Sequence, residues 1–454
     1  MRDLDIHDAC MKAVDSYTGT TGNSQPRYKH YPYPQRLQVL SNNLRVHVLR
    51  ESGDFNTFLT LQEQVFNLQA SQIGKLDNDV YDLIKWLKST IDLIPEVTRE
   101  ENTHVHLVAC WGEKYTKKML NYCFPSLMAD GNFPALTKEK RIIVYVATTE
   151  LDKAAIQSSN IYKKMVDIGI LFDWVIIPKI DSDVAYWALG AVASLGLHYA
   201  KIHHASFHHS YPDIVYSGKF FSEMLRLSKK HRVILGSGMR SDETLMMPKI
   251  KHYAKDCALD IPCADLVAHH LDCIHPVAWG MMVNNRPAYW MFPESHVQIW
   301  ESEAHMHINS PHVMAHWLDA GVVSRLPTRY YQTLDSEMDL ICEDRDWYMI
   351  CDDEAYQAEL SAPDRQHLND SYCHASGVAA FLWGCITHRD TAKFFFSEMR
   401  LPINREIRPA SSNVIPISQV ETLQRFLYNE IVSSDRFAGV KLARKRTHEG
   451  WIFQ

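Results

Sequence analysis

The sequence lacks the motifs that identify several large enzyme classes. It contains no P-loop, no G-x-G-x-x-G, no G-x-S-x-G and no H-E-x-x-H. These motifs bind phosphates in P-loop NTPases, bind dinucleotides, carry the nucleophile of serine hydrolases, and supply the zinc ligands and base of zincin proteases. Their absence argues against all four classes.

The sequence also lacks a cysteine pattern typical of disulfide-bonded proteins, and it has no long apolar run. The ten cysteines are scattered with no C-x-x-C pair, which fits a reducing compartment. The longest nearly uncharged run, Val184 to Ala200, is shorter than the roughly 20 residues of a membrane-spanning helix. The opening MRDLDIHDAC is polar and lacks the apolar core of a signal peptide. We therefore expect a cytoplasmic protein with no transmembrane segment.

Charge of one sign is not in large excess. The chain has 47 Lys and Arg residues against 54 Asp and Glu residues, a formal net charge of −7. Both signs are mixed along the sequence, which argues against a nucleic-acid partner. An anionic small ligand needs only a local positive pocket and stays compatible with this balance.

The pattern of apolar residues predicts three regions in the 454 residues. Residues 1–100 are expected to form a helical N-terminal extension, and residues 346–454 a helical C-terminal region. Between them, over residues 101–345, strands and helices alternate in steps of about 30 residues. The expected strands include HVHLVAC, RIIVYVATT, FDWVIIPKI and RVILGSG. This alternation predicts an α/β, Rossmann-like fold with a mostly parallel sheet flanked by helices, which binds ligands beyond the C-terminal strand ends.

Three histidine-rich segments stand out: HYAKIHHASFHHSYPDIVYSG, VAHHLDCIHPVAWG and EAHMHINSPHV. In the first, His204 and His208 would share one face if the segment were helical. In the third, His305 and His307 would share one face of a strand and form a two-ligand metal arm. Three such groups keep a metal-dependent hydrolase as an alternative, although their spacing matches no particular metal family.

Several short motifs, taken in order, resemble a family. They are VACWGEKYTKKMLNYCFPSLMADGNFPAL, VYVATTELD, PDIVYSGKFFSEML, HRVILGSGMR, HPVAW, HMHINSPHV and TLDSEMDLI. Together they resemble the GT-A-type nucleotide-sugar glycosyltransferase-like proteins, a largely uncharacterised bacterial group. The resemblance covers His104 to Leu340, about half the chain.

The resemblance implies a donor site at the ends of the first two strands. Trp111 and Tyr115, in the W-G-x-x-Y turn with Gly112, would stack on the nucleotide. Thr148 and Thr149 would offer polar groups to it. Further along the chain, Ser217 and Arg240 would also contact the donor, and Arg240 would bind the negative charge of its diphosphate or of an acidic sugar.

Asp213 occupies the position where such enzymes carry D-x-D, whose carboxylates hold Mn²⁺ or Mg²⁺ against a diphosphate. The second carboxylate is missing here, and Ser217 follows where the family has aspartate. This departure leaves metal dependence open. The resemblance implies His305 or His307 as a further metal ligand, and Asp335 as the base for an acceptor hydroxyl.

The predicted function is therefore transfer of a sugar from a nucleotide-sugar donor to an unidentified glycan or small-molecule acceptor, in bacterial glycan biosynthesis. Two alternatives remain: a metal-dependent hydrolase that uses the histidine groups, and a catalytically degenerate GT-A-like domain that binds a nucleotide or glycan.

Overall fold

The structure is a computed structural model. It describes residues 75–95, 102–178, 185–275, 298–302, 304–309, 313–331, 334, 341–342, 346–362, 398–409, 443–447 and 450–453. The chain divides into two compact units. The first comprises Met1–Glu96, Ile177–Tyr199 and Pro327–Thr333, and the second comprises the rest. The boundaries expected near residues 100 and 345 lie outside the described residues.

The first unit contains helix α4 (Lys75–Leu93) and most of helix α10 (Ala185–Ile202). In α4, Leu83, Ile84 and Leu87 are buried at the helix-like spacing that predicted this element. The helix expected over Val184 to Ala200 is α10, in which Ser194 Oγ accepts a hydrogen bond from the Tyr331 amide. Among the described helices, none has the length and apolar character needed to cross a membrane.

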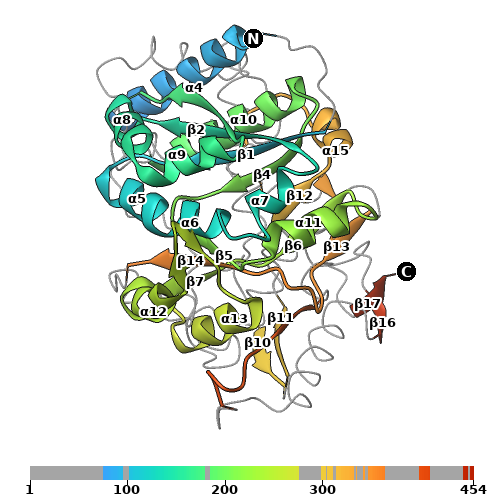
Figure 1. The fold of residues 1–454 in the computed structure, drawn as a ribbon. Coiled ribbons are helices and arrows are strands. Elements are labelled where there is room, and N and C mark those ends of the chain that lie inside the picture. Colours follow the sequence, from blue (N-terminus) through green and yellow to red (C-terminus); the bar gives the residue numbers. More distant parts are fainter. Residues whose placement is uncertain are drawn as a thin grey trace, which may run out of the picture. The chain divides into compact units, whose positions relative to one another are not determined.

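The second unit is built on a seven-stranded sheet with the order β13-β6-β12-β4-β1-β2-β3 (Figure 1). Its strands are β1 (Thr103–Ala109), β2 (Arg141–Thr148), β3 (Leu171–Ile176), β4 (Ser206–Ser210), β6 (Val233–Gly236), β12 (Met314–Leu318) and β13 (Trp347–Met349). Only β12 runs antiparallel to its neighbours within this sheet. All seven residues of β1 are buried, as expected for a strand covered on both faces. The expected mixed α/β fold with a mostly parallel sheet is confirmed.

Helices flank this sheet and follow several of its strands (Figure 1). They are α5 (Glu113–Lys118), α6 (Phe124–Leu127), α7 (Phe133–Leu136), α8 (Glu150–Ser158), α9 (Asn160–Asp167), α11 (Phe220–Ser228) and α15 (Ala320–Arg325). Two further helices, α12 (Glu243–Ile250) and α13 (Cys263–Asp272), lie instead against strands of the smaller sheets described below. A π-helical turn, Met119–Cys123, joins α5 to α6, and a 3-10 turn, Lys251–Tyr253, follows α12.

Smaller sheets complete the described chain. They are β5 (Ile214–Tyr216), β14 (Gln357–Ser361) and β7 (Met239–Asp242); β10 (Gln298–Glu301), β11 (His305–Asn309) and β15 (Met399–Pro402); β8 (Ala254–Lys255) and β9 (Ala258–Leu259); and β16 (Ala443–Thr447) with β17 (Gly450–Phe453). The described part of residues 346–454 consists of strands and loops, and the segment SQVETLQRFLYNEIVSS, which carried the helical expectation there, lies outside it.

Strand order creates a reversal point beside β1. The chain builds β1, β2 and β3 outward in one direction and then returns to place β4 on the other side of β1. In open α/β sheets, ligands bind at the carboxyl ends of the strands where the strand order reverses. The fold therefore directs attention to the residues that follow Ala109 and Ser210.

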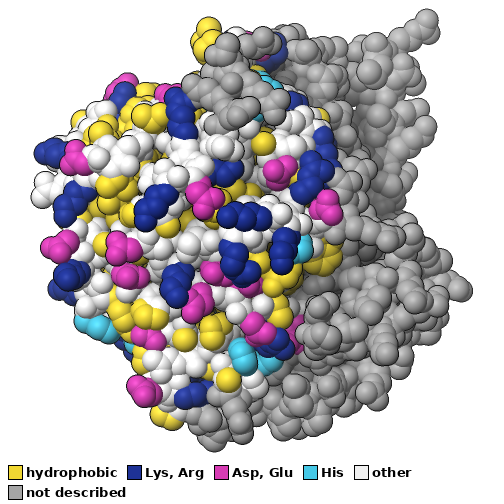
Figure 2. All heavy atoms as spheres, turned by 45° about the vertical axis from the view of Figure 1, so that its right-hand side comes forward, with side chains coloured by type: hydrophobic (Ala, Val, Ile, Leu, Met, Phe, Trp, Pro, Cys, Tyr) yellow, Lys and Arg dark blue, Asp and Glu magenta, His cyan; other side chains and the backbone are white. Residues whose placement is uncertain are grey.

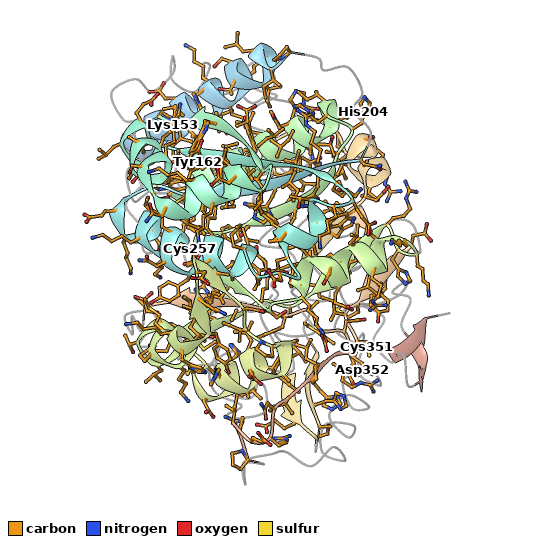
Figure 3. The ribbon with its side chains drawn as sticks, in the orientation of Figure 1. Lys153, Tyr162, His204, Cys257, Cys351 and Asp352 are labelled. Atoms are coloured by element: carbon orange, nitrogen blue, oxygen red, sulfur yellow. The ribbon has the colours of Figure 1, made fainter. Side chains whose placement is uncertain are left out.

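Most of the first histidine-rich segment belongs to the core. His208 lies on the central strand β4, so the suggested helical alignment with His204 is wrong; His204 lies in the preceding turn, with a φ of 48° (Figure 3). His208 Nδ1 donates to the backbone oxygen of His316 at 2.7 Å, and its Nε2 lies 2.9 Å from Tyr216 Oη.

Four imidazoles gather inside this unit and are each at most 1% exposed: His104 and His106 on β1, His208 on β4 and His316 on β12. The ring of His106 stacks on that of His208, with centroids 5.0 Å apart. Burial lowers the pKa of all four, to about 3 for His208 and His316. These side chains are neutral core residues. A sequence such as SFHHS looks polar and does not predict a buried strand.

A tight backbone approach near α6 gives a first testable prediction. A Cβ on Gly131 would lie 2.5 Å from the carbonyl oxygen of Gly218 and 3.0 Å from the Cα of Lys219. Because backbone atoms cannot rotate away, we expect Gly131→Ala to lower the free energy of unfolding by about 1–3 kcal/mol. Urea unfolding measures this change. Substitution of the exposed neighbour Asp130 by alanine is the matched control, and an equal effect of both changes would contradict the assigned contact.

Candidate active site

One carboxylate ties together the ends of the first two strands. Asp152 accepts hydrogen bonds from the Gly112 amide at 2.9 Å, Thr116 Oγ1 at 2.9 Å and Thr149 Oγ1 at 2.7 Å. The amide of Asp152 in turn donates to Thr149 Oγ1, which caps helix α8. With three donors and 6% exposure, Asp152 fixes the geometry of the two turns.

The remaining residues predicted at these strand ends differ in exposure. Trp111 is half-buried and Tyr115 is 43% exposed. Gly112 has a φ of 84°, and a Cβ built on it would meet nothing within 4 Å, so its backbone faces open space. Thr148 is fully buried, and its Oγ1 has no hydrogen-bond partner among the described residues. The aromatic side chains are the more accessible part of this predicted donor site.

A set of five ionisable side chains, here called the charged cluster, lies beyond the ends of β1 and β4. Its members are Lys118 on α5, Asp213 between β4 and β5, Arg240 on β7, Glu243 on α12 and Glu359 on β14.

Lys118 and Arg240 each hold a carboxylate of this cluster. Lys118 Nζ forms an ion pair with Glu243 and lies 3.9 Å from Asp213 Oδ2. Arg240 Nε lies 3.0 Å from Glu359 Oε1. The side-chain exposed fractions rise from 7% for Lys118 and 12% for Asp213 to 53% for Arg240. The cluster thus has a buried floor and an exposed rim.

Strand pairing brings the members of the cluster together from distant parts of the sequence. Strand β14 runs antiparallel to β5 and parallel to β7, which places Glu359 opposite both Ile214 and Arg240. The Leu360 amide donates to the Asp213 carbonyl oxygen at 2.8 Å. A second carboxylate therefore does lie near Asp213, although it is absent from the local motif.

Sequence reasoning missed Lys118, Glu243 and Glu359. No sequence motif surrounds Glu243 or Glu359. The sequence also does not indicate that β14 pairs with β5 and β7, which brings Glu359 close to Asp213 and Arg240. Lys118 resembles its neighbour Lys117, yet the two side chains are 7% and 68% exposed.

The environment of Asp213 is unusual for a carboxyl group. Burial, and next the nearby charge of Glu359, raise its pKa to about 7, while Lys118 and Arg240 act in the opposite direction. Burial and the charges of Asp213 and Glu359 also raise the pKa of Tyr115, whose ring centroid lies 5.5 Å from Lys118 Nζ. A carboxyl group that titrates near neutral pH is suited to proton transfer.

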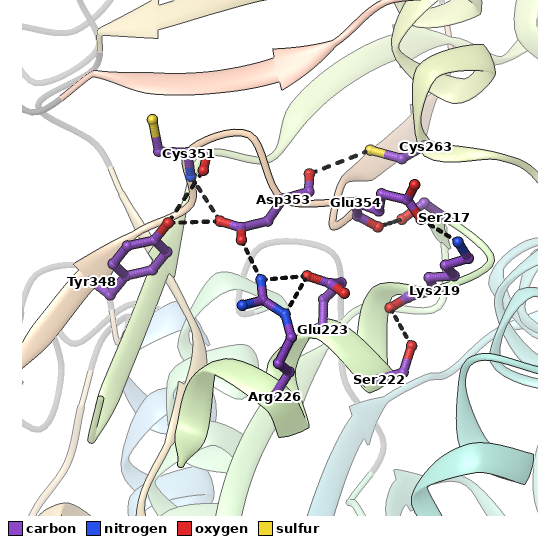
Figure 4. Close-up of polar contacts among 10 residues, drawn as sticks. All are labelled: Ser217, Lys219, Ser222, Glu223, Arg226, Cys263, Tyr348, Cys351, Asp353 and Glu354. Atoms are coloured by element: carbon purple, nitrogen blue, oxygen red, sulfur yellow. Dashed lines mark hydrogen bonds and ion pairs between the residues drawn. The ribbon is translucent and has the colours of Figure 1, made fainter. Parts of the chain in front are cut away.

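Ser217 and Lys219 have structural contacts. Ser217 Oγ donates to the Glu354 carbonyl oxygen at 3.1 Å and accepts from the Tyr356 amide at 3.1 Å. Lys219 is exposed and pairs with Glu354 at 2.6 Å (Figure 4). In the same view Asp353 joins Arg226 and Tyr348, so the whole group braces the segment before β14. The donor-binding role predicted for Ser217 stays a prediction, and its described contacts are those of a residue that holds this segment.

The two histidines predicted as metal ligands contact other side chains. His305 Nε2 lies 3.3 Å from Asp352 Oδ1, a residue labelled in Figure 3. His307 Nδ1 lies 2.7 Å from Glu398 Oε1, and its Nε2 lies 2.9 Å from Ser302 Oγ. Over the described ranges, no group of three or more His, Cys, Asp and Glu side chains is arranged to hold a metal ion. Asp335, predicted as the base, lies outside the described residues.

Surface charge agrees with the balance seen in the sequence. On the face shown in Figure 2, Lys and Arg side chains alternate with Asp and Glu side chains across the described surface. No broad positive area of the kind that binds nucleic acid appears among the described residues on that face.

Comparisons with known proteins identify no family for this chain. No protein-family model matches the chain, and no curated protein matches it. A solved structure of S. aureus TarS is similar with a TM-score of 0.31 and 11% sequence identity, over 74% of this chain and 54% of that chain. This chain thus spans about half the length of that protein. At this identity and TM-score the likeness identifies neither a family nor an activity.

Proposed function

We propose that this protein is a GT-A-type glycosyltransferase that moves a sugar from a nucleotide-sugar donor to a glycan or small-molecule acceptor. One observation carries the proposal: at the reversal point beside β1 the exposed ring of Tyr115 lies over the Lys118 ammonium of the charged cluster, and Trp111 lies in the turn before the same helix. A ligand with an aromatic base, charged phosphates and sugar hydroxyls matches such a combination.

The proposed roles follow exposure and charge. Tyr115 and Trp111 offer ring faces to the base, and the open backbone at Gly112 allows close approach of the ligand. Arg240, the exposed cation at the rim, would bind phosphate oxygens through its guanidinium fork. Asp213 would contact the reacting part of the ligand at the buried floor.

The described side chains do not fit the Mn²⁺ or Mg²⁺ site implied by the resemblance. The Lys118 ammonium already lies 3.9 Å from Asp213, and a divalent cation at that carboxylate would be repelled by it. Glu359 is already paired with Arg240, and His305 and His307 contact Asp352 and Glu398. Metal dependence stays a prediction.

The test is thermal unfolding of the protein with UDP-, GDP-, CMP- and dTDP-sugars, each with and without Mn²⁺. A ligand at 100 times its dissociation constant adds about 2.7 kcal/mol to stability, a shift of a few degrees. We expect a shift with one nucleotide that is lost in Tyr115→Ala and in Arg240→Ala. Lys117→Met, at an exposed position of the same helix, is the matched control and should keep the shift. No shift with any of these ligands would contradict the proposal.

The alternatives predict different results. A metal-dependent hydrolase would contain stoichiometric zinc or iron that is lost when His305 and His307 become alanine. A degenerate domain would bind the nucleotide-sugar without releasing nucleoside diphosphate, even with acceptor mixtures. Metal analysis and an assay for released nucleoside diphosphate on the same sample separate the three possibilities.

A further inference from the structure

Three side chains on the sheet of β10, β11 and β15 form a hydrogen-bonded chain. Ser302 Oγ lies 2.9 Å from His307 Nε2, and His307 Nδ1 lies 2.7 Å from Glu398 Oε1. Because a carboxylate only accepts, Nδ1 of the neutral imidazole donates to Glu398, and Nε2 then accepts from the serine hydroxyl. A nucleophile, a base within hydrogen-bond reach and a third group that orients the base are the signature of nucleophilic catalysis.

The register of the three strands brings these side chains together. His307 lies on the middle strand β11 and is paired with Arg400 of β15, two residues after Glu398. Ser302 follows β10, and its amide donates to the His305 carbonyl oxygen at 2.8 Å, which continues the pairing of β10 with β11. Residues two apart on a strand share a face. Ser302 and Glu398 therefore lie diagonally across from His307, on the same face and on either side of it.

Burial holds the base in place and leaves the nucleophile accessible. The side chains of His307 and Glu398 are only 8% and 13% exposed, whereas Ser302 is partly exposed. The Ser302 hydroxyl also lies 3.4 Å from the His305 carbonyl oxygen, so its contact with the imidazole is the shorter of the two. This is the arrangement that activation of a serine requires.

A second serine–histidine pair shows by contrast what distinguishes this site. Ser241 Oγ lies 2.7 Å from His270 Nδ1, but both residues are 0% exposed. The Nε2 atom of His270 has no hydrogen-bond partner among the described residues, so no described carboxylate orients this ring. The pair on β7 and α13 is thus a core contact that no substrate reaches.

The triad differs from what the sequence predicted for its members. His307 was predicted as a metal ligand, yet both of its ring nitrogens contact other side chains, Glu398 and Ser302. The missing G-x-S-x-G motif excludes one way of presenting a serine, at the turn between a strand and a helix. A triad is recognised by its geometry, however, and occurs on unrelated folds with different chain orders.

The charges next to the serine are paired. Arg405 donates to the Ser302 carbonyl oxygen and forms an ion pair with Glu301 at 2.7 Å. Arg400, on the neighbouring strand β15, forms an ion pair with Asp352. Because each guanidinium already has a carboxylate partner, these surroundings favour an uncharged substrate over an anionic one.

We propose that Ser302, His307 and Glu398 form a catalytic site that hydrolyses an uncharged carboxylic ester. Ser302 Oγ bonds to the carbonyl carbon while its proton passes to His307 Nε2. The bond between that carbon and the alcohol oxygen then breaks, and His307 gives the proton to the leaving alcohol. Water, losing a proton to His307, attacks the acyl-serine and releases the carboxylic acid, and His307 returns the proton to Ser302. Glu398 is the positioning residue for His307.

This activity goes beyond the proposed sugar transfer and uses no member of the charged cluster. The two proposals therefore succeed or fail independently, because ester hydrolysis is measured without any nucleotide-sugar.

The first experiment treats the full-length protein with an alkyl fluorophosphonate, from which an activated serine displaces fluoride. Intact mass and peptide mapping should show one label per chain, on Ser302. His307→Asn should lower the labelling rate at least about 100-fold, because a general base contributes about 10²–10⁴-fold. Ser158→Ala is the matched control: Ser158 is exposed on α8 and donates only to the Ala155 carbonyl oxygen of its own helix. This variant should be labelled like wild type.

The second experiment measures hydrolysis of p-nitrophenyl acetate and p-nitrophenyl butyrate. We expect Ser302→Ala and His307→Asn to lower kcat/KM at least about 100-fold, and Ser158→Ala to leave it unchanged. Glu398→Gln should lower kcat about 10-fold or more with KM unchanged, because the amide can donate to Nδ1 and favours the wrong imidazole tautomer. Glu398→Asp, which keeps the acceptor, should restore part of the activity. A merely structural role of Glu398 would not separate kcat from KM in this way.

Three results would overturn the proposal: no label on Ser302 in the wild-type protein, equal labelling rates in wild type and folded His307→Asn, or ester hydrolysis no faster than in Ser302→Ala. The labelling of wild type requires no variant, so it decides even if a substitution at His307 prevents folding. None of these results bears on binding of a nucleotide-sugar at the charged cluster.

Discussion

Lowering the pH from 7.5 to 5.5 should reduce the free energy of unfolding by roughly 5 kcal/mol. The four buried imidazoles of His104, His106, His208 and His316, whose pKa values burial holds well below 6.5, account for this loss, and buried His270, whose pKa is likewise lowered to about 3, adds to it. In the unfolded chain each has a pKa of about 6.5 and takes up a proton below that pH. Each therefore costs about 1.4 kcal/mol of stability at one pH unit below its unfolded pKa.

The direction of this effect follows from which state binds more protons. Below pH 6.5 the unfolded chain binds protons at these four sites and the folded protein does not, so stability falls as the pH falls. The loss continues until the pH reaches the folded pKa, about 3 for His208 and His316. Since typical domains have only 5–15 kcal/mol of stability, we expect unfolding at mildly acidic pH.

Urea unfolding at pH 7.5, 6.5 and 5.5 measures the effect. Replacement of His106 by leucine removes one imidazole that packs against the aromatic rings of Phe133 and Phe221. This variant should lose less stability between pH 7.5 and 5.5 than wild type, by about 1.4 kcal/mol. Stability that stays flat over this range would show that the imidazoles are not buried and neutral.

Replacement of Asp152 by alanine should lower the free energy of unfolding by about 3–5 kcal/mol, since each buried donor left without an acceptor costs about 1–3 kcal/mol. The change leaves three donors without an acceptor: the Gly112 amide and the hydroxyls of Thr116 and Thr149. Because Asp152 joins the turns after β1 and β2, the substitution should also abolish nucleotide-sugar binding through loss of this geometry.

The matched control for this prediction is Glu150→Ala. Glu150 lies in the same first turn of α8 but is exposed, so its loss should change stability by at most about 0.5 kcal/mol. Thermal and urea unfolding of both variants compare the two effects. Similar stabilities for the two variants would contradict the role assigned to Asp152.

The sequence predicted much of the sheet because most of its strands are apolar runs. β1, β2, β3 and β6 are such runs, and a strand buried on both faces has no other common signature. β4 was missed because two of its five residues are histidine, which reads as polar although a neutral imidazole tolerates the core. Its position beside β1 depends on a return of the chain across the sheet, which no local pattern encodes.

The candidate site was less accessible to sequence reasoning. Asp213 was found through the family resemblance, and Tyr115 through its turn motif. Lys118 and Glu359 were not found, because their significance comes from burial and from the pairing of β14 with β5 and β7. The contacts of His305 and His307 with Asp352 and Glu398 likewise arise from segments distant in the sequence.

The central claim is that the carboxyl ends of β1 and β4 bind a nucleotide-sugar. Crystals of the protein grown with the nucleotide-sugar that gives the largest thermal shift test it most directly. We expect difference density for the ligand beside Tyr115, with the phosphates near Arg240. Ligand density at any other part of the molecule, with Tyr115 and Arg240 uncontacted, would contradict this claim.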